Sequence, residues 1–173
     1  MSKKVLIAYF SRKGNNYVSG RIENLEVGNT EVVASMIQKV TDGDIFEVES
    51  TNIYPKDYYE TTKVAQDEYR TNARPKLTDT ISHIDSYDVI FLGYPNWWGT
   101  MPMSVFTFLE SYDFSGKEII PFCTHEGSGM GRSEYDIKKL CPNADLKKGI
   151  AIRGSSVKNA EKEISKWVVK TLE

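Results

Sequence analysis

Short apolar runs alternate with longer stretches of mixed polarity along the chain. Val5 to Phe10 is apolar throughout, which is typical of a strand buried on both faces. Residues 44–49 alternate apolar and polar positions, which favours a more exposed strand. Three further strands are predicted at residues 87–94, 118–123 and 146–153, the last weakened at its start by Lys147, Lys148 and Gly149.

Between these runs, apolar side chains recur every three or four residues, as on one face of a helix. Helices are predicted from about residue 30 to 40, 57 to 72, 103 to 111, 133 to 140 and 157 to 172. The predicted N-caps are Thr30 for the first helix, Ser133 for the fourth, and Ser155 or Ser156 for the last.

This alternation predicts an α/β fold: a three-layer αβα sandwich in which helices cover both faces of a five-stranded parallel sheet. The length of 173 residues and the lack of repeats or linkers favour a single domain over residues 1–173. Ligands of such sheets bind beyond the carboxyl ends of strands. The loops after the first, third and fourth predicted strands are therefore the candidate site.

The first loop begins Ser11-Arg12-Lys13 and returns at Asn29 and Thr30, just before a predicted helix. Hydroxyls and free N–H groups at a helix start form an anion site. An ordinary capped helix after a flexible loop is the alternative. Residues 17–28 lack a helical period and are predicted to be an excursion of this loop. Neither a Walker motif nor a dinucleotide fingerprint follows the first strand.

The second loop, Pro95-Asn96-Trp97-Trp98-Gly99, contains two adjacent tryptophans. They cannot both face one core from a regular helix or strand, so at least one is predicted to lie in a loop. A flat aromatic ligand would give that ring a partner. Packing of both rings over the end of the local core is the alternative.

The third loop contains Thr124, His125, Glu126, Gly127, Ser128 and Gly129. Its glycines allow the backbone to approach a ligand closely. A single histidine here indicates hydrogen bonding or packing rather than proton transfer, and Glu126 is interpreted as a solvated carboxylate. The three loops together offer a phosphate cradle, a stacking surface and backbone contacts, which are the three features that FMN requires.

The composition narrows the possible partners. A net charge of −2, with 40% hydrophobic and 27% charged residues, shows no basic excess, so nucleic acid is not an expected partner. No run approaches the roughly 18 apolar residues of a membrane span, and no secretion signal is recognisable. We therefore expect no membrane insertion and a cytoplasmic location. Cys123 and Cys141 lack metal-site spacing with the two histidines, so structural thiols and no metal are predicted.

The chain resembles the flavodoxin-like FMN-binding family in four segments: residues 9–14, 28–30, 93–102 and 124–129. The resemblance implies the strand order 2-1-3-4-5. It also implies FMN contacts at Ser11, Arg12, Lys13, Asn29, Thr30, Pro95, Asn96, Trp97, Trp98, Gly99, Thr124, His125, Glu126, Gly127, Ser128 and Gly129. Ser11 matches the first hydroxyl of the family's phosphate loop, Lys13 stands where a second is expected, and Asn29 and Thr30 resemble its end.

Two functions follow from this resemblance: an FMN-binding electron-transfer flavoprotein, and an FMN-dependent NAD(P)H:quinone or azo-type oxidoreductase. The lack of a separate nicotinamide motif favours the carrier. The low net charge weakens steering to a protein partner, and residues 97–102 resemble a quinone-reductase loop. The expected partner is a redox protein or a small quinone-like acceptor, and no side chain is predicted to be catalytic. A binding module without flavin is a third hypothesis.

Overall fold

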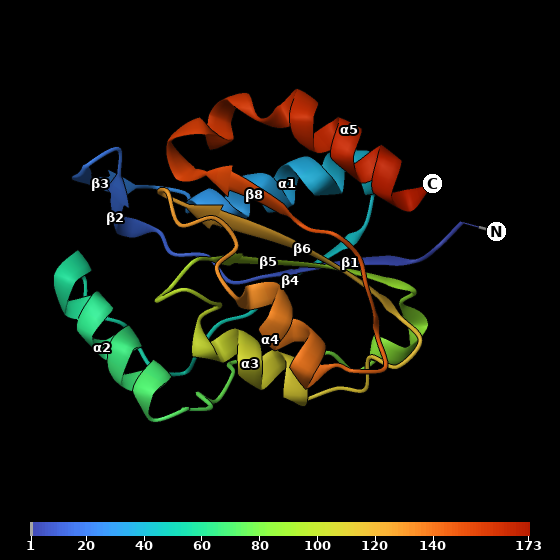
Figure 1. Cartoon of the computed structure of the whole chain (residues 1–173), viewed down its shortest axis with the longest axis horizontal. Coiled ribbons are helices and arrows are strands. Elements are labelled where there is room, and N and C mark those ends of the chain that lie inside the picture. Colours follow the sequence, from blue (N-terminus) through green and yellow to red (C-terminus); the bar gives the residue numbers. More distant parts are fainter. Residues whose placement is uncertain (1) are drawn as a thin grey trace.

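The computed structural model describes residues 2–173 and shows a parallel sheet between two helical layers (Figure 1). The sheet has the order β4-β1-β5-β6, and β7 and β8 both pair with β6. Its strands are β1 Val5–Tyr9, β4 Asp44–Glu47, β5 Val89–Pro95, β6 Glu118–His125, β7 Asp145–Leu146 and β8 Ile150–Arg153. The predicted three-layer sandwich and the order 2-1-3-4-5 are confirmed when β7 and β8 are taken as one interrupted strand.

Helices cover both faces of this sheet (Figure 1). They are α1 Asn29–Thr41, α2 Tyr58–Arg70, α3 Met103–Glu110, α4 Ser133–Leu140 and α5 Glu161–Leu172, with short 3₁₀ turns η1 Ile84–Ser86 and η2 Gly154–Asn159. Alternate residues of β1 enter opposite cores: Val5 and Ile7 pack with α1 and α5, and Leu6 and Ala8 pack on the side of α3 and α4. The fully apolar sequence of this strand predicted such burial on both faces.

The prediction of five sheet strands needs one correction, because the last strand is interrupted. Ile119 of β6 pairs with Leu146, and Phe122 pairs with Ile150, so one strand advances three residues while its neighbour advances four. The extra residue is a β-bulge. Pro121, which has no N–H to donate, lies within this gap. Residues 145–153 therefore form β7 and β8, and the sheet has six strands.

The predicted excursion after the first strand is also not a simple loop. Residues 14–25 form an antiparallel hairpin of β2 Gly14–Val18 and β3 Arg21–Leu25. Ser19 and Gly20 connect the strands, with φ values of 50° and 86°. Positive φ at both central residues defines the type I′ turn that suits the twist of a hairpin. The hairpin projects beyond the carboxyl ends of the sheet strands, near α2 (Figure 1).

The predicted helix caps were wrong at three ends. The residue before α1 is Gly28, and Thr30 lies buried inside the first turn. Arg132 precedes α4, so Ser133 is its first residue, and α5 follows Ala160 because residues 154–159 form η2. Ser11 replaces the missing cap of α1: its Oγ accepts a hydrogen bond from Glu31 N at 3.1 Å.

No helix in the described part of the chain combines the length and apolarity that a membrane crossing requires.

Candidate functional site

Three loops converge where β1, β5 and β6 end, and they enclose two adjoining cavities. The smaller has a volume of about 280 Å³ and the larger about 490 Å³. Arg12, Asn96, Trp97 and Ser128 are among the residues that line both, so the two cavities adjoin. The smaller cavity includes the start of α1, whereas the larger extends along α2.

The smaller cavity is polar where it meets α1. Within residues 2–173, the backbone N–H groups of Asn29 and Thr30 have no acceptor. Gly28 lies so close to the first loop that an added Cβ would be 2.2 Å from Ser11 Oγ and 2.6 Å from the Arg12 carbonyl oxygen. The close approach at Gly28 brings the helix start against the first loop, which leaves two donors at the positive end of α1 for an anion.

A buried pair of hydroxyls joins this helix start to the third loop. Thr30 and Thr124 are 1% and 4% exposed, and their Oγ1 atoms are 2.8 Å apart. Since each hydroxyl can donate or accept, the pair retains a proton that can be directed to a ligand. The hydrogen bond also fixes the spacing between the first and third loops.

The tryptophan loop is a tight turn. Trp97 N donates to the Thr100 carbonyl at 2.9 Å, and Thr100 N donates back at 3.3 Å. Trp98 and Gly99 have φ values of 58° and 86°, which again defines a type I′ geometry. Tryptophan rarely adopts positive φ, so the surrounding contacts must hold the turn in this shape.

Asn96 supplies one of those contacts and ties the turn to the third loop. Its backbone N–H donates to the Thr124 carbonyl at 2.8 Å, and its side-chain amide donates to the Gly129 carbonyl at 2.8 Å. Its Oδ1 accepts from Gly99 N at 3.0 Å. Beyond the turn, Arg132 N donates to the Gly99 carbonyl at 2.8 Å. Asn96 therefore ties the second loop to the third and orients the tryptophans.

The sequence left open whether the two tryptophans pack on the core or face a ligand, and the two rings differ in this respect. Trp97 is half-buried, with its ring nearly perpendicular to those of Phe10 and Tyr54 at centroid distances of 5.0 and 5.3 Å. Trp98 is 47% exposed, and its Nε1 donates to the Thr62 carbonyl of α2 at 3.0 Å. Trp97 thus covers the core and Trp98 is presented on the surface, and both rings line the larger cavity.

The third loop is closed by hydrogen bonds within itself and to its neighbours. His125 Nδ1 accepts from Gly127 N at 2.8 Å, and burial, reinforced by the charge of Arg153, lowers the pKa of His125. The Glu126 carboxylate accepts from Ser155 N at 3.1 Å and from Ser19 N at 3.4 Å. A neutral imidazole and an engaged carboxylate agree with structural rather than proton-transfer roles.

Arg12 and Lys13 point in different directions. Arg12 Nε donates to the Asn15 carbonyl, and Nη2 donates to the carbonyls of Pro55 and Lys56, so it links the first loop to the segment before α2. Burial lowers the pKa of Arg12. Lys13 is exposed and lines a separate hollow with Ser11, near Glu47 and Glu49.

Most of the residues that the sequence indicated do converge. The two joined cavities are lined by Arg12, Asn29, Thr30, Pro95, Asn96, Trp97, Trp98, Gly99, Thr124, His125, Glu126 and Ser128. Ser11 and Lys13 line the separate hollow, and Gly127 and Gly129 line neither joined cavity. Ser11 contributes instead through its bond to Glu31 N, and Gly129 through the carbonyl that Asn96 binds.

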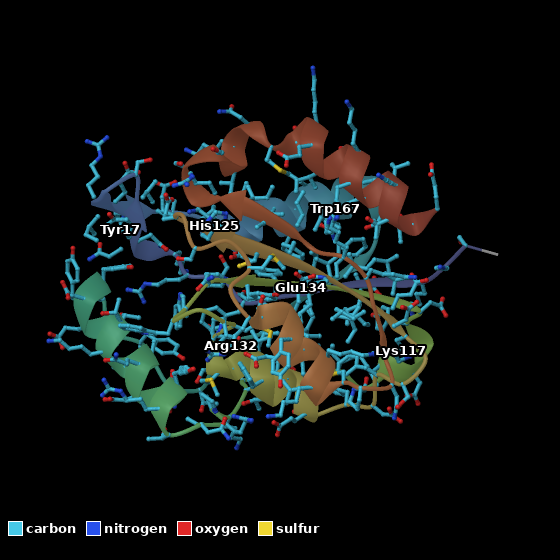
Figure 2. All side chains as sticks on the ribbon, in the orientation of Figure 1. Tyr17, Lys117, His125, Arg132, Glu134 and Trp167 are labelled. Atoms are coloured by element: carbon cyan, nitrogen blue, oxygen red, sulfur yellow. The ribbon has the colours of Figure 1, made fainter. Side chains whose placement is uncertain are left out.

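Sequence reasoning missed three tyrosines that line the larger cavity: Tyr17 of β2, and Tyr58 and Tyr59 of α2. Figure 2 shows Tyr17 on the hairpin, at the same end of the molecule as His125. The Ser19-Gly20 pair was the available signal, because a Ser-Gly dipeptide marks a turn, and a hairpin turn there would place Tyr17 in a strand.

The two cysteines are both free and buried. Burial raises the pKa of Cys123 to about 12 and that of Cys141 to about 11. Both thiols therefore stay protonated near neutral pH and pack as small apolar groups.

Residues 4–171 match the family described as Flavodoxin, and the chain belongs to that family. Its fold is similar to that of a protein from Bacteroides eggerthii provisionally assigned as a flavoprotein, with 27% identity and a TM-score of 0.79 over 99% of each chain. A second such protein, from Bacteroides uniformis, is 26% identical with a TM-score of 0.73, covering 98% of this chain and 99% of its own.

The fold also resembles that of a flavoprotein from Lactobacillus acidophilus solved in complex with FMN. That protein is 23% identical, with a TM-score of 0.65 over 93% of this chain and 99% of its own. No curated protein matches the chain.

Proposed function

We propose that this protein binds FMN in the two joined cavities and transfers electrons through it. The observation that carries the proposal is the pairing of two adjoining cavities: free backbone donors lie at the start of α1 beside the smaller one, and two indole rings line the larger one. Membership in the flavodoxin family and the FMN complex of the similar Lactobacillus acidophilus protein support the same cofactor.

The residues present fit a phosphate at the polar end. The N–H groups of Asn29 and Thr30 would hold its oxygens, with hydroxyls from Thr30 and Thr124 close by. Arg12 and Glu126 are the charged side chains that line the smaller cavity, and their formal charges cancel. Recognition of the phosphate therefore depends on neutral donors and the dipole of α1 rather than on net charge.

The residues also fit a flat ring system at the other end. Trp97 and Trp98 offer aromatic surface, and His125, Glu126 and Ser128 of the third loop also line the cavities. When bound, FMN supplies the redox chemistry. The chain's own groups position the ring, exclude water from it and hold the surrounding loops in place.

Two uses of the flavin are proposed. The first is the electron carrier typical of the family, which exchanges electrons with a protein partner. The second is an FMN-dependent reductase of small quinone-like or azo acceptors, which the aromatic lining of the larger cavity favours. A cytoplasmic location is proposed for either.

A binding titration tests the cofactor directly. We expect purified protein to take up one FMN per chain, with quenching of tryptophan fluorescence, and to bind riboflavin at least tenfold more weakly because riboflavin lacks the phosphate. Absence of FMN uptake would reject the proposal, and equal affinity for both ligands would reject the phosphate site. Anaerobic mixing with NAD(P)H then separates the two uses, since only the reductase should bleach the flavin without a partner protein.

A further inference from the structure

Three tyrosines from two elements form a second aromatic surface around the larger cavity. Tyr17 comes from the hairpin, and Tyr58 and Tyr59 begin α2; Tyr17 and Tyr58 also line the smaller cavity. We call these three residues the tyrosine wall. Figure 1 shows the hairpin and α2 projecting beyond the carboxyl ends of the strands at the same end of the molecule. The wall therefore lies at the end of the molecule where the three loops meet.

The wall is an ordered cluster. The rings of Tyr17 and Tyr58 lie 6.1 Å apart with an interplanar angle of 34°, and those of Tyr58 and Tyr59 lie 5.2 Å apart at 88°. Trp98 joins the same helix through its hydrogen bond to the Thr62 carbonyl. The tyrosine wall and the tryptophans thus surround one cavity and are fixed relative to one another.

Core packing does not account for these side chains. None of the three belongs to either hydrophobic core, and Tyr17 and Tyr59 remain 39% and 58% exposed. Clustered exposed aromatics around a concave space are typical of a site that takes a flat ligand. Each ring offers stacking surface and a hydroxyl that can bind a polar edge.

The cavity also contains one positively charged donor. Arg12 commits Nε and Nη2 to backbone carbonyls, but within residues 2–173 its Nη1 makes no hydrogen bond. Among the residues that the structure describes, it is the only lysine or arginine that lines the larger cavity. One free guanidinium edge suits a carbonyl oxygen on a ring.

We infer that the tyrosine wall binds a small flat aromatic acceptor of the quinone class beside the cofactor. This inference rests on the proposed FMN binding. In the reaction, reduced FMN gives two electrons and one proton to the quinone, a second proton comes from water, and the products are oxidised FMN and a hydroquinone. A reductant such as a reduced pyridine nucleotide restores the flavin.

Anaerobic stopped-flow mixing of FMN-loaded, dithionite-reduced protein tests the wall. With 1,4-naphthoquinone, we expect Tyr58→Leu and Tyr17→Leu each to slow flavin reoxidation about tenfold. With ferricyanide, which is not a flat ring, their rates should equal that of the wild type. Tyr58→Phe keeps the ring and should keep at least half of the naphthoquinone rate. Tyr135→Leu is the matched control, because Tyr135 is 68% exposed on α4 and lies outside this cavity.

A second measurement does not depend on turnover. Calorimetric binding of 2-naphthol, a flat ring that FMN does not reduce or oxidise under these conditions, should weaken about tenfold in the same two leucine variants. Unchanged 2-naphthol affinity and naphthoquinone rates in both variants would overturn the inference, as would equal slowing with ferricyanide. If these results appear in protein that binds FMN normally, only the wall hypothesis falls. If the wild type binds no FMN, the proposed function falls as well.

Discussion

The hairpin and the tryptophan loop use the same turn in two mechanical settings. Ser19-Gly20 and Trp98-Gly99 both have positive φ at two successive residues, with nearly equal values. The tryptophan turn is bound on several sides by Asn96, Arg132 and Thr62. Outside its own ladder, the hairpin tip makes a long hydrogen bond, in which Ser19 N donates to the Glu126 carboxylate at 3.4 Å.

This difference shows how one backbone geometry can form a fixed platform or a projecting arm. Neither serine nor tryptophan is the preferred residue at the first central position, where asparagine and aspartate fit best. The hairpin holds its turn through local strand pairing, whereas the tryptophan turn needs tertiary contacts. The site thus combines a rigid ring platform with a more weakly attached hairpin.

The strongest test of the platform is Asn96→Ala. It removes the two side-chain hydrogen bonds, which leaves the Gly99 N–H without its partner and the Gly129 carbonyl with only the weak thiol donor of Cys123, so the free energy of unfolding should fall by about 3 kcal/mol. FMN affinity should fall with it. Urea unfolding provides the measurement. Asn24→Ala in the hairpin is the matched control, because Asn24 is exposed, and it should change stability by no more than about 0.5 kcal/mol. Equal effects at both positions would contradict the distinction between platform and arm.

Gly28→Ala tests the close approach between the first loop and the start of α1, where the chain returns from the hairpin. The added Cβ would overlap Ser11 Oγ and the Arg12 carbonyl, and such overpacking costs about 2 kcal/mol. The backbone must then shift away from the first loop, so FMN affinity should fall more than riboflavin affinity.

Ser11→Ala is the companion variant for Gly28→Ala, measured by thermal unfolding and FMN titration. It removes only the bond to Glu31 N and should cost about 1 kcal/mol. If Gly28→Ala is as mild as Ser11→Ala, the close approach at Gly28 does not shape the cradle.

Trp98→Asn separates the geometry of the turn from the ring that it presents. Asparagine tolerates positive φ, so the turn should survive with little change in unfolding midpoint. The lost ring should weaken FMN binding about tenfold, or about 1.4 kcal/mol. Fluorescence titration of FMN gives the affinity. A variant that binds FMN as well as the wild type would show that Trp98 is not a stacking surface.

The parts of the molecule that the sequence predicted well are those whose burial is encoded locally. Val5 to Tyr9 is apolar at every position because both faces of β1 are covered, and its strand was predicted. The hairpin strands are mostly exposed, so their sequence shows no strong apolar alternation. The bulge after Leu146 arises from pairing with β6, which no local pattern reveals.

The candidate site shows the same division. The three loops were predicted because each follows a recognisable buried strand, although their roles in cofactor binding stay predictions. The cap of α1 was missed because Ser11 supplies it from 20 residues before Glu31. Tyr17 and Tyr58 were missed because only the folded chain brings the hairpin and α2 together. The tryptophan pair was informative because two adjacent large rings are difficult to bury on one face.

The third loop links the platform to the arm, and acid should weaken this link. In the folded state, burial lowers the pKa of His125 from its ordinary value near 6.5. As pH falls below that value, the unfolded chain takes up the proton first, so stability should fall. A protonated Nδ1 also cannot accept from Gly127 N.

Urea midpoints at pH 7.5 and 5.5 measure this effect. The difference between the two urea midpoints should be smaller in His125→Gln than in the wild type. In the control His83→Gln it should equal that of the wild type. An unchanged difference in His125→Gln would assign the acid sensitivity to other groups.

The smallest expected effect concerns the hairpin turn itself. Ser19→Asn places a residue that favours positive φ before Gly20, so it should stabilise the hairpin by about 0.5 kcal/mol. Because the tip has few outside contacts, that gain should appear as slower amide exchange within residues 14–25 and leave exchange around Asn96 unchanged. Hydrogen exchange resolved by residue measures both regions in one sample. Slower exchange in both regions would mean that the hairpin and the tryptophan turn open together, and the arm would then be part of the platform.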